Sequence, residues 1–313
     1  MATAVATGIM APFVEKDYWL TSVLYALSRS AYREIIVFKG GTSLAKAYGF
    51  ISRFSEDVDL ALIADNLSGN QVKSRIDRIS KTITHHLEEV YLKDVTSKGS
   101  RFRRTGHRFA ALSDALILPT QAREELIIEI NAFANPYPFE NLPIHSLIGG
   151  FLSQQGRTDI LQAYDLAPFT LQVLHPTRTL AEKILALARA AYHPQPVLQL
   201  GFKIRHIYDI FCLMQQAELQ DFVASSAFFD TLRAVQADDA QNTEFQGAWA
   251  SQPLSESWIY RDDASLWEAL APVYSGAFAT LTYGDLPPLD QVRQIFTVLA
   301  ERLRAYDISL PMT

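Results

Sequence analysis

The sequence predicts an α/β (α+β) protein with a mixed sheet in the first part of the chain and a mostly helical second part. Short apolar, β-branched segments, such as EIIVF at 34–38, occur only before about residue 176. After that point the apolar residues recur with helical spacing. Together with the length of 313 residues, this change of pattern predicts two domains, 1–170 and 171–313.

Composition narrows the class of protein. The chain is 49% hydrophobic and 20% charged, as folded proteins usually are. Its single cysteine, Cys212, excludes an internal disulfide and zinc sites that need two or more thiolates. The first residues lack a basic group before their apolar stretch, and no apolar run approaches the ~20 residues that span a bilayer. We therefore expect a cytoplasmic protein with no membrane partner.

The first elements are a helix and a strand that leads into a glycine turn. Residues 15–28 carry apolar side chains at helical spacing, and we expect the charges of Glu15–Asp17 at the helix end and on the surface. The strand at 34–38 runs into Lys39-Gly40-Gly41-Thr42-Ser43, after which LAKAYGF is helical. The next strand is DVDLALI at 57–63, which alternates before it becomes fully apolar.

The later elements complete the predicted sheet and begin the helical part. We expect a helix from about 67 to 92, a strand at 125–133, a loop with three prolines at 135–143 and a last strand at 168–176. Pro176-Thr177 then opens a helix that ends at His193-Pro194. Helical patterns are clearest at 201–216, 223–236 and 289–306.

Asp57 and Asp59 are the first candidates for chemistry. They are two residues apart on a predicted strand, so both carboxylates leave the same face and repel one another unless a cation lies between them. Mg²⁺, or Mn²⁺ in its place, binds a few carboxylates together with substrate phosphate oxygens. The preceding turn at Gly40–Ser43 would offer backbone N–H groups to such a phosphate.

Glu129 is the third candidate metal ligand. It lies between Ile128 and Ile130 in an apolar strand, and its carboxylate can alternate to the face opposite theirs. There it would need solvent or a metal, because a buried unpaired charge is costly. Three carboxylates around one or two Mg²⁺ ions are what displacement at a nucleotide α-phosphate requires. A strand residue that simply faces solvent is the alternative.

Charge is distributed unevenly along the chain. Residues 214–313 carry a net charge of −9, whereas the residues before them carry +3. A basic run, Lys93–Arg108, includes Arg101, Arg103, Arg104 and Arg108. These arginines are candidate RNA contacts, although such a run is also typical of a solvated loop or hairpin.

Five motifs in order resemble the nucleotidyltransferase AbiEii/AbiGii toxin family, which includes MenT-like toxins and belongs to the DNA polymerase β-like nucleotidyltransferase superfamily. The resemblance runs from about residue 13 to 215 and rests on these segments: VEKDYWLTSVL, FKGGTSLAKAY, FSEDVDLAL, LAEKILALARA and RHIYDIF. The last hundred residues carry no motif of this kind.

The resemblance implies a polymerase β-like nucleotidyltransferase domain whose site residues fall on matching positions. Asp57 and Asp59 would be catalytic metal ligands. The nucleotide would be bound by Gly41, Thr42, Ser43 and Lys183. Asp209 would complete the site, positioning Lys183 or the acceptor. From the residues alone, Lys183 could be a solvated helix residue, whereas Asp209 lies in an apolar helix and needs a cation such as Lys183 or Arg205.

The expected function is a Mg²⁺-dependent nucleotidyltransferase toxin of a toxin–antitoxin or phage-defence system. It would move a nucleoside monophosphate from an NTP to RNA, with the tRNA 3′ end as the implied acceptor, and a cognate antitoxin would be its protein partner. The helical domain would complete the site and bind acceptor or antitoxin. Two alternatives remain: an aminoglycoside-type small-molecule nucleotidyltransferase, and a non-catalytic nucleotide-binding protein. The sequence does not fix the oligomeric state.

Overall fold

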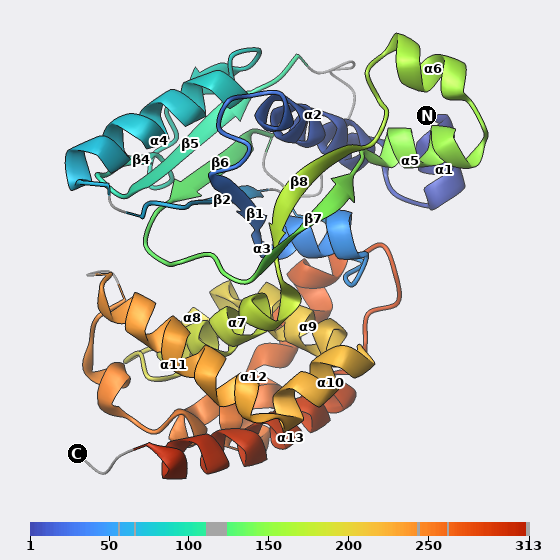
Figure 1. Cartoon of the computed structure of the whole chain (residues 1–313). Helices are drawn as coiled ribbons and strands as arrows, with labels where there is room; N and C mark the ends of the chain where they lie inside the picture. The colour runs from blue at the N-terminus through green and yellow to red at the C-terminus, as the bar shows by residue number, and fades with distance from the viewer. Residues whose placement is uncertain (56, 66, 111–123, 243–244, 262, 311–313) are drawn as a thin grey trace. The chain divides into compact units, whose positions relative to one another are not determined.

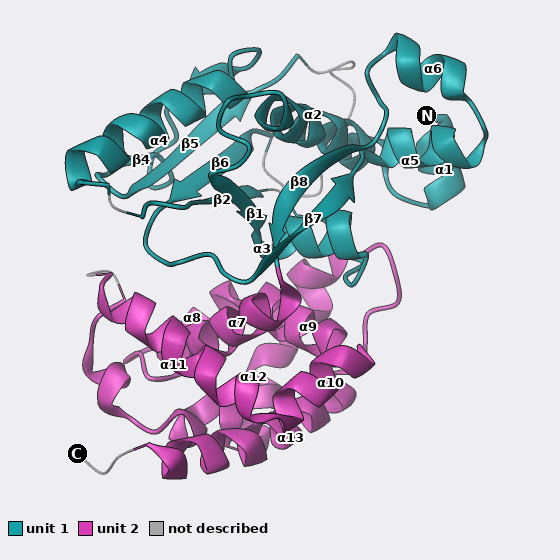
Figure 2. Cartoon of the chain, viewed as in Figure 1, with its two compact units in different colours: residues 1–174 teal, residues 175–313 magenta. Residues whose placement is uncertain are grey.

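The computed structural model describes residues 1–55, 57–65, 67–110, 124–242, 245–261 and 263–310. The chain forms two compact units, Met1–Leu174 and His175–Thr313, coloured separately in Figure 2. The first unit includes the strand at 169–174, so it extends past residue 170, where we expected the first domain to end.

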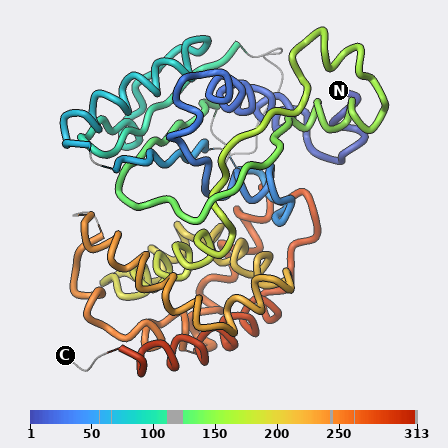
Figure 3. Tube along the Cα trace, viewed as in Figure 1, coloured from blue at the N-terminus to red at the C-terminus, as the bar shows by residue number. Residues whose placement is uncertain are grey.

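The first unit is built on one mixed sheet. Within the described residues eight strands take the order β3-β5-β6-β2-β1-β8-β7, with β4 paired to β5 (Figure 1). The pairs β1/β8 and β2/β6 are parallel, and the other pairs are antiparallel. Figure 3 shows that β1 and β8, far apart in the sequence, run side by side. The strands are β1 (Ile36–Lys39), β2 (Asp57–Leu62), β3 (Glu88–Val90), β4 (Ser97–Lys98), β5 (Phe102–Arg108), β6 (Leu126–Asn131), β7 (Phe139–Ile144) and β8 (Phe169–Leu174).

Two helices, α2 (Ala11–Ser28) and α4 (Gly69–Ile83), provide the apolar layer over one face of this sheet. Val58 and Leu60 of β2 and Ile128 and Ile130 of β6 belong to the same fully buried cluster as the apolar residues of both helices. Because side chains alternate along a strand, the residues between these four point to the opposite face. That face is where Asp57, Asp59 and Glu129 lie, as the alternation predicted.

The glycine turn and the smaller helices complete the first unit. After β1 the chain enters a single helical turn, α3 (Gly40–Ser43), and continues as a π-helix (Leu44–Tyr48). Helix α1 (Ala2–Thr7) precedes α2, and α5 (Leu147–Gln154) and α6 (Thr158–Ala163) lie between β7 and β8 in the chain.

Helices are the main elements among the described residues of the second unit. Its first helix begins at Pro176, as predicted, since proline suits the first helical position. The helices are α7 (Pro176–Ala191), α8 (Pro196–Phe202), α9 (Ile204–Leu213), α10 (Ala217–Ala224), α11 (Ser226–Ala240), α12 (Ala264–Val273) and α13 (Leu289–Ser309). Short 3-10 turns at Ala248–Ser251, Leu254–Glu256, Trp258–Tyr260 and Ala279–Leu281 and a π-turn at Tyr274–Phe278 connect them.

Several predicted elements differ from the structure in extent. The helical pattern at 201–216 is divided between α8 and α9, and the pattern at 223–236 between α10 and α11. Two elements of the first unit differ more. The helix expected at 67–92 ends at Ile83, and the strand β3 follows it. Helix α4 begins where a capping box forms, because the Ser68 hydroxyl accepts from the Gln71 N–H while the Gln71 side chain accepts from the Ser68 N–H. The loop expected at 135–143 largely becomes β7, and Pro143 is tolerated because β7 lies at the edge of the sheet.

Candidate active site

A row of four charged side chains crosses the sheet on the face opposite α2 and α4. Lys39 of β1 pairs in register with Asp59 of β2, Asp59 with Glu129 of β6, and Glu129 with Arg104 of β5. Directly opposed residues on adjacent strands share a face. The row therefore places two carboxylates side by side with a cation at each end.

Asp57 adds a third carboxylate to this row. It lies two residues before Asp59 on the same face of β2, and its Oδ2 is 3.7 Å from Nη2 of Arg104. The Nε atom of Arg104 is 4.0 Å from Oε2 of Glu129. All three side chains are partly accessible, so the cluster faces solvent or a ligand rather than the core.

The electrostatic environment of Glu129 favours a cation nearby. Burial raises the pKa of its carboxyl group, and the negative charge of Asp57 raises this pKa further, while Arg104, Lys39 and a hydrogen bond from Asn131 oppose the increase. A divalent cation at this place would stabilise the ionised carboxylates, as metal ions do for acidic groups close to them.

The glycine turn lies directly against these carboxylates. Gly40 has a φ of +79°, which favours glycine, and a Cβ atom added there would lie 2.1 Å from Oδ2 of Asp59. A Cβ atom on Gly41 would lie 2.3 Å from Nη2 of Arg53. Gly40 is therefore required by close approach and by its backbone conformation, whereas a side chain at Gly41 would first displace the end of the Arg53 side chain.

The hydroxyls of the turn donate hydrogen bonds to backbone carbonyls of the protein itself. Thr42 donates a hydrogen bond from Oγ1 to the Asp57 carbonyl, and Ser43 donates from Oγ to the Gly40 carbonyl at 2.9 Å. Both side chains are buried. A role of Thr42 and Ser43 in nucleotide binding would thus use their backbone N–H groups, and the Thr42 bond also fixes the start of β2 against the turn.

Lys183 and Asp209 form a buried ion pair within the second unit. Nζ of Lys183 lies 2.8 Å from Oδ2 of Asp209 and 3.2 Å from Nδ1 of His206. The pair joins α7 to α9, and its side chains are 6% and 0% exposed. The expectation that Asp209 needs a cation, with Lys183 as one candidate, is confirmed, and the solvated alternative for Lys183 is wrong.

The arginines of the basic run occupy different faces. Arg103 is buried, lies 2.9 Å from Asp77 of α4, and therefore drops out of the candidate RNA contacts. Arg101 is exposed and donates from Nε to the Ala132 carbonyl. Arg108 is exposed and lies 3.7 Å from Glu88. Arg104 is the member of the set that reaches the carboxylates.

A charged cluster on α2 was misread from the sequence. Glu15, Lys16 and Asp17 are all buried, not exposed as expected. Asp17 binds Lys46 of the π-helix at 2.5 Å and accepts a hydrogen bond from the Leu147 N–H at 2.7 Å. This carboxylate therefore links three elements: α2, the helix that follows the glycine turn, and α5. A charge run at a helix start gives no sign of such burial.

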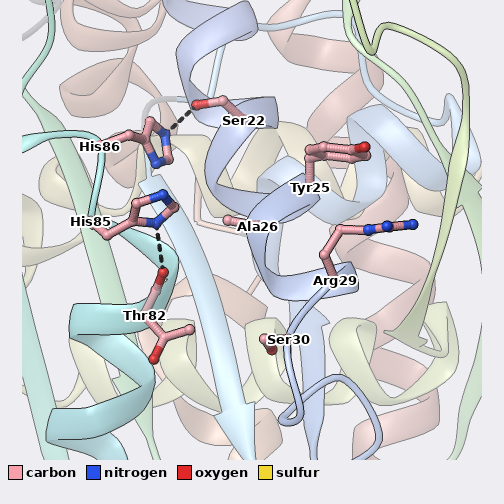
Figure 4. A pocket seen from close by; sticks show the side chains of 8 residues that line it. All are labelled: Ser22, Tyr25, Ala26, Arg29, Ser30, Thr82, His85 and His86. Atoms are coloured by element: carbon pink, nitrogen blue, oxygen red, sulfur yellow. Dashed lines mark hydrogen bonds between the residues drawn. The ribbon is translucent and has the colours of Figure 1, made fainter. Parts of the chain in front are cut away.

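An open pocket in the first unit does not coincide with the carboxylates. It has a volume of about 610 Å³ and lies beside α2 and the end of α4 (Figure 4). Ser22 contacts His86 there at 2.7 Å, and His85 contacts the Thr82 carbonyl at 3.0 Å. None of the residues predicted from the sequence lines this cavity, so we do not place the active site in it.

The carboxylate oxygens suit a hard divalent cation, but they do not form a complete cage. Over residues 1–55, 57–65, 67–110, 124–242, 245–261 and 263–310 the structure contains no group of three His, Cys, Asp or Glu side chains placed to hold one metal ion. Such an arrangement fits Mg²⁺, which usually binds one or two carboxylates and takes its other ligands from water and substrate phosphates.

The mixed sheet, the glycine turn after β1 and the paired carboxylates of β2 agree with the nucleotidyltransferase class that the sequence motifs resemble. The family model for the nucleotidyl transferase AbiEii toxin of type IV toxin–antitoxin systems matches residues 22–298, and the chain belongs to this family. The protein is accordingly a nucleotidyltransferase toxin, and a cognate antitoxin is its implied partner.

The fold agrees with a solved structure of the same kind. The chain is similar to MenT4, a nucleotidyltransferase toxin from Mycobacterium tuberculosis H37Rv, with a TM-score of 0.57 and 19% sequence identity. The match covers 98% of this chain and 92% of that one. A comparison with curated protein sequences gave no significant match. Among its described helices, none has the length and apolar character needed to cross a bilayer.

Proposed function

We propose that the protein transfers a nucleoside monophosphate from an NTP to an RNA acceptor, with the tRNA 3′ end as the specific acceptor, in a Mg²⁺-dependent reaction in the cytoplasm. The observation that carries this proposal is the set of carboxylates Asp57, Asp59 and Glu129 on one sheet face, with the turn at Gly40 packed against Asp59.

Asp57 and Asp59 would hold the metal ion, and Glu129, which pairs in register with Asp59 on the neighbouring strand, would add negative charge beside it without completing a three-carboxylate site. Mg²⁺ or Mn²⁺ bound there would neutralise charge on the substrate phosphates and lower the pKa of the acceptor hydroxyl. Gly40 keeps the Asp59 carboxylate in place, since any side chain there would displace it. Thr42 does the same for the start of β2 by its bond to the Asp57 carbonyl.

The nucleotide phosphates would bind at the glycine turn. The backbone N–H groups at the start of a helix favour anions, and Gly41–Ser43 lie in the single helical turn that follows β1. The family resemblance adds Lys183 as a contact to the triphosphate. Within its own unit, Asp209 fixes the Lys183 ammonium at 2.8 Å and so would act as a positioning residue.

RNA as the acceptor is supported by the distribution of charge. Arg101, Arg104 and Arg108 are accessible on or beside β5, and such cations supply the salt-dependent affinity of proteins for phosphate backbones. The acidic residues of 214–313, with a net charge of −9, would repel RNA. We therefore propose that the acidic residues of 214–313 contact the antitoxin rather than the RNA.

A labelling experiment with cellular RNA tests the proposal. Purified protein is incubated with Mg²⁺, total RNA and each α-³²P-labelled NTP in turn, and the products are resolved on a denaturing gel. We expect label on a tRNA-sized band from wild-type protein and none from the Asp57→Asn, Asp59→Asn double variant.

The two alternative functions give different outcomes in the same tubes. Pyrophosphate release that depends on an added aminoglycoside, with no labelled RNA, would favour a small-molecule acceptor. NTP binding without pyrophosphate release would favour a non-catalytic nucleotide-binding protein. Either outcome would refute RNA as the acceptor.

A further inference from the structure

Arg104 differs from the other arginines of the basic run in the face that it occupies. It stands opposite Glu129 in register, at the end of the row that contains Asp59 and Lys39. Its neighbour Arg103 alternates to the other face and pairs with Asp77. The position of Arg104 therefore belongs to the site and not to the outer surface of the hairpin.

The pairing of Arg104 with the carboxylates is loose. Its separations from Asp57 and Glu129 are 3.7 and 4.0 Å, beyond the range of hydrogen bonds. Its Nε atom is buried without a hydrogen-bond partner among the described residues, while 34% of the side chain is exposed. A guanidinium has five N–H donors in a planar fork, so Arg104 keeps donors that an oxygen-rich ligand can reach.

The chemistry of those donors selects the class of ligand. Guanidinium groups bind phosphate through two parallel hydrogen bonds, which are charge-assisted and therefore strong. Both substrates of the proposed reaction, the NTP and the RNA, carry phosphate. The position of Arg104 in the sheet determines which of the two it can bind.

The strand order separates Arg104 from the glycine turn. That turn follows β1, whereas Arg104 lies on β5, and β2 and β6 stand between them. Three strand spacings amount to about 14 Å. An NTP whose β- and γ-phosphates bind at the turn would place its α-phosphate near Asp57 and Asp59 on β2. The acceptor hydroxyl attacks that phosphorus in line, from the side opposite the leaving pyrophosphate and the turn. The acceptor is then the substrate that comes to the β5 end of the row.

We infer, building on the proposed function, that Arg104 binds a backbone phosphate of the acceptor RNA next to its terminal nucleotide, and that it does not bind the NTP triphosphate. This contact would set the 3′ hydroxyl beside the carboxylates. Arg104 is thus a determinant of acceptor specificity, since a small molecule without a neighbouring phosphate would lose the contact.

Binding measurements without turnover test this role. A 5′-fluorescein single-stranded RNA is titrated with full-length protein in EDTA, and its anisotropy is followed at several salt concentrations. Arg104→Gln should lower the affinity for RNA by about 10- to 100-fold, as expected for the loss of a pair of charged hydrogen bonds. It should also reduce the slope of log K against log salt by about 0.7, the value for one phosphate on a single strand.

Two controls accompany this variant. Arg157, which pairs with Asp159 at 2.9 Å, is another exposed arginine of the first unit, and Arg157→Gln should leave RNA affinity within about twofold of wild type. Arg104→Lys keeps the charge but loses the fork, so we expect an intermediate affinity. Calorimetry with a non-hydrolysable NTP should give the same affinity for wild type and Arg104→Gln, and this measurement also shows that the variant is folded.

The possible failures are distinguishable. If wild-type protein labels RNA but Arg104→Gln and Arg157→Gln bind it equally well, the role of Arg104 is refuted and the proposed function stands. A loss of NTP affinity in Arg104→Gln would assign the residue to the triphosphate instead. If wild-type protein neither binds nor labels RNA, both the RNA acceptor and the role of Arg104 are wrong.

Discussion

The contact between Gly40 and Asp59 leads to a sharp prediction for Gly40→Ala. The added Cβ atom would lie 2.1 Å from Oδ2 and 2.9 Å from Cγ of Asp59, whereas real Cβ atoms essentially never come within 3.0 Å of a heavy atom. Either the carboxylate or the turn must therefore shift by about 1 Å. A displacement of about 1 Å in a catalytic group can cost about 100-fold in rate.

The backbone conformation adds a cost in stability. Gly40 has a φ of +79°, and a residue with a Cβ atom loses roughly 1–2 kcal/mol in this left-handed region. Gly40→Ala should thus lower the free energy of unfolding by about that amount and reduce nucleotide transfer at saturating NTP about 100-fold or more. Urea unfolding and the RNA-labelling rate are the two measurements.

Gly49→Ala is the matched control. Gly49 ends the π-helix that follows the same turn and has a φ of +67°, and a Cβ atom added there would meet no described heavy atom within 4 Å. This variant should lose similar stability but keep its transfer rate within a few fold of wild type. Equal transfer rates for Gly40→Ala and wild type would refute the assignment of Asp59 to the reaction. An equal loss of transfer rate in Gly40→Ala and Gly49→Ala would also refute it.

Three further perturbations concern the buried groups and the metal. Lys183→Met should destabilise the fold by about 3–5 kcal/mol in urea unfolding, because Asp209 keeps a buried charge without its partner. The double variant Lys183→Met, Asp209→Leu should recover most of this loss of stability. A double variant as unstable as Lys183→Met would contradict the pairing. Burial lowers the pKa of His107 from 6.5 to about 4, so protonation favours the unfolded state and stability should fall by up to about 3 kcal/mol as pH drops from 6.5 to 4. His107→Gln should flatten the dependence of the unfolding free energy on pH. If the variant keeps the wild-type dependence, other groups cause it. Removal of divalent ions with EDTA should stop transfer without unfolding, and added Mg²⁺ should raise the melting temperature of wild type but not of Asp57→Asn, Asp59→Asn; an equal increase in both would place the metal elsewhere.

The sheet strands next to the core could be predicted from the sequence, and the charged strands could not. β2 and β6 are largely apolar segments whose charged residues fall on one face, two in β2 and one in β6, which is a strong pattern. β5 reads FRRTGHR, and its charges suggested a hairpin or loop. It becomes a strand because Arg103 finds Asp77 on one face and Arg104 finds the carboxylates on the other. Those partners are distant in sequence.

The candidate residues of the site could be named from the sequence, but their arrangement could not be predicted. The two-residue spacing fixed the shared face of Asp57 and Asp59, and the family motifs pointed to Lys183 and Asp209. The alignment of Lys39 and Arg104 with the carboxylates depends on strand order and register, which local patterns do not determine. Burial of Asp17 was missed for the same reason, because its partners Lys46 and Leu147 come from other elements.

The choice between α- and γ-labelled NTP tests the central claim most directly. A single purified tRNA is incubated with the protein, Mg²⁺ and the preferred NTP, labelled in parallel tubes at the α- or the γ-phosphate. Nucleotidyl transfer predicts that the RNA acquires α-label, becomes longer and carries no γ-label, and that the Asp57→Asn protein yields neither. Label from the γ-phosphate on the RNA would show phosphoryl transfer and contradict the account, and so would α-label that persists in Asp57→Asn.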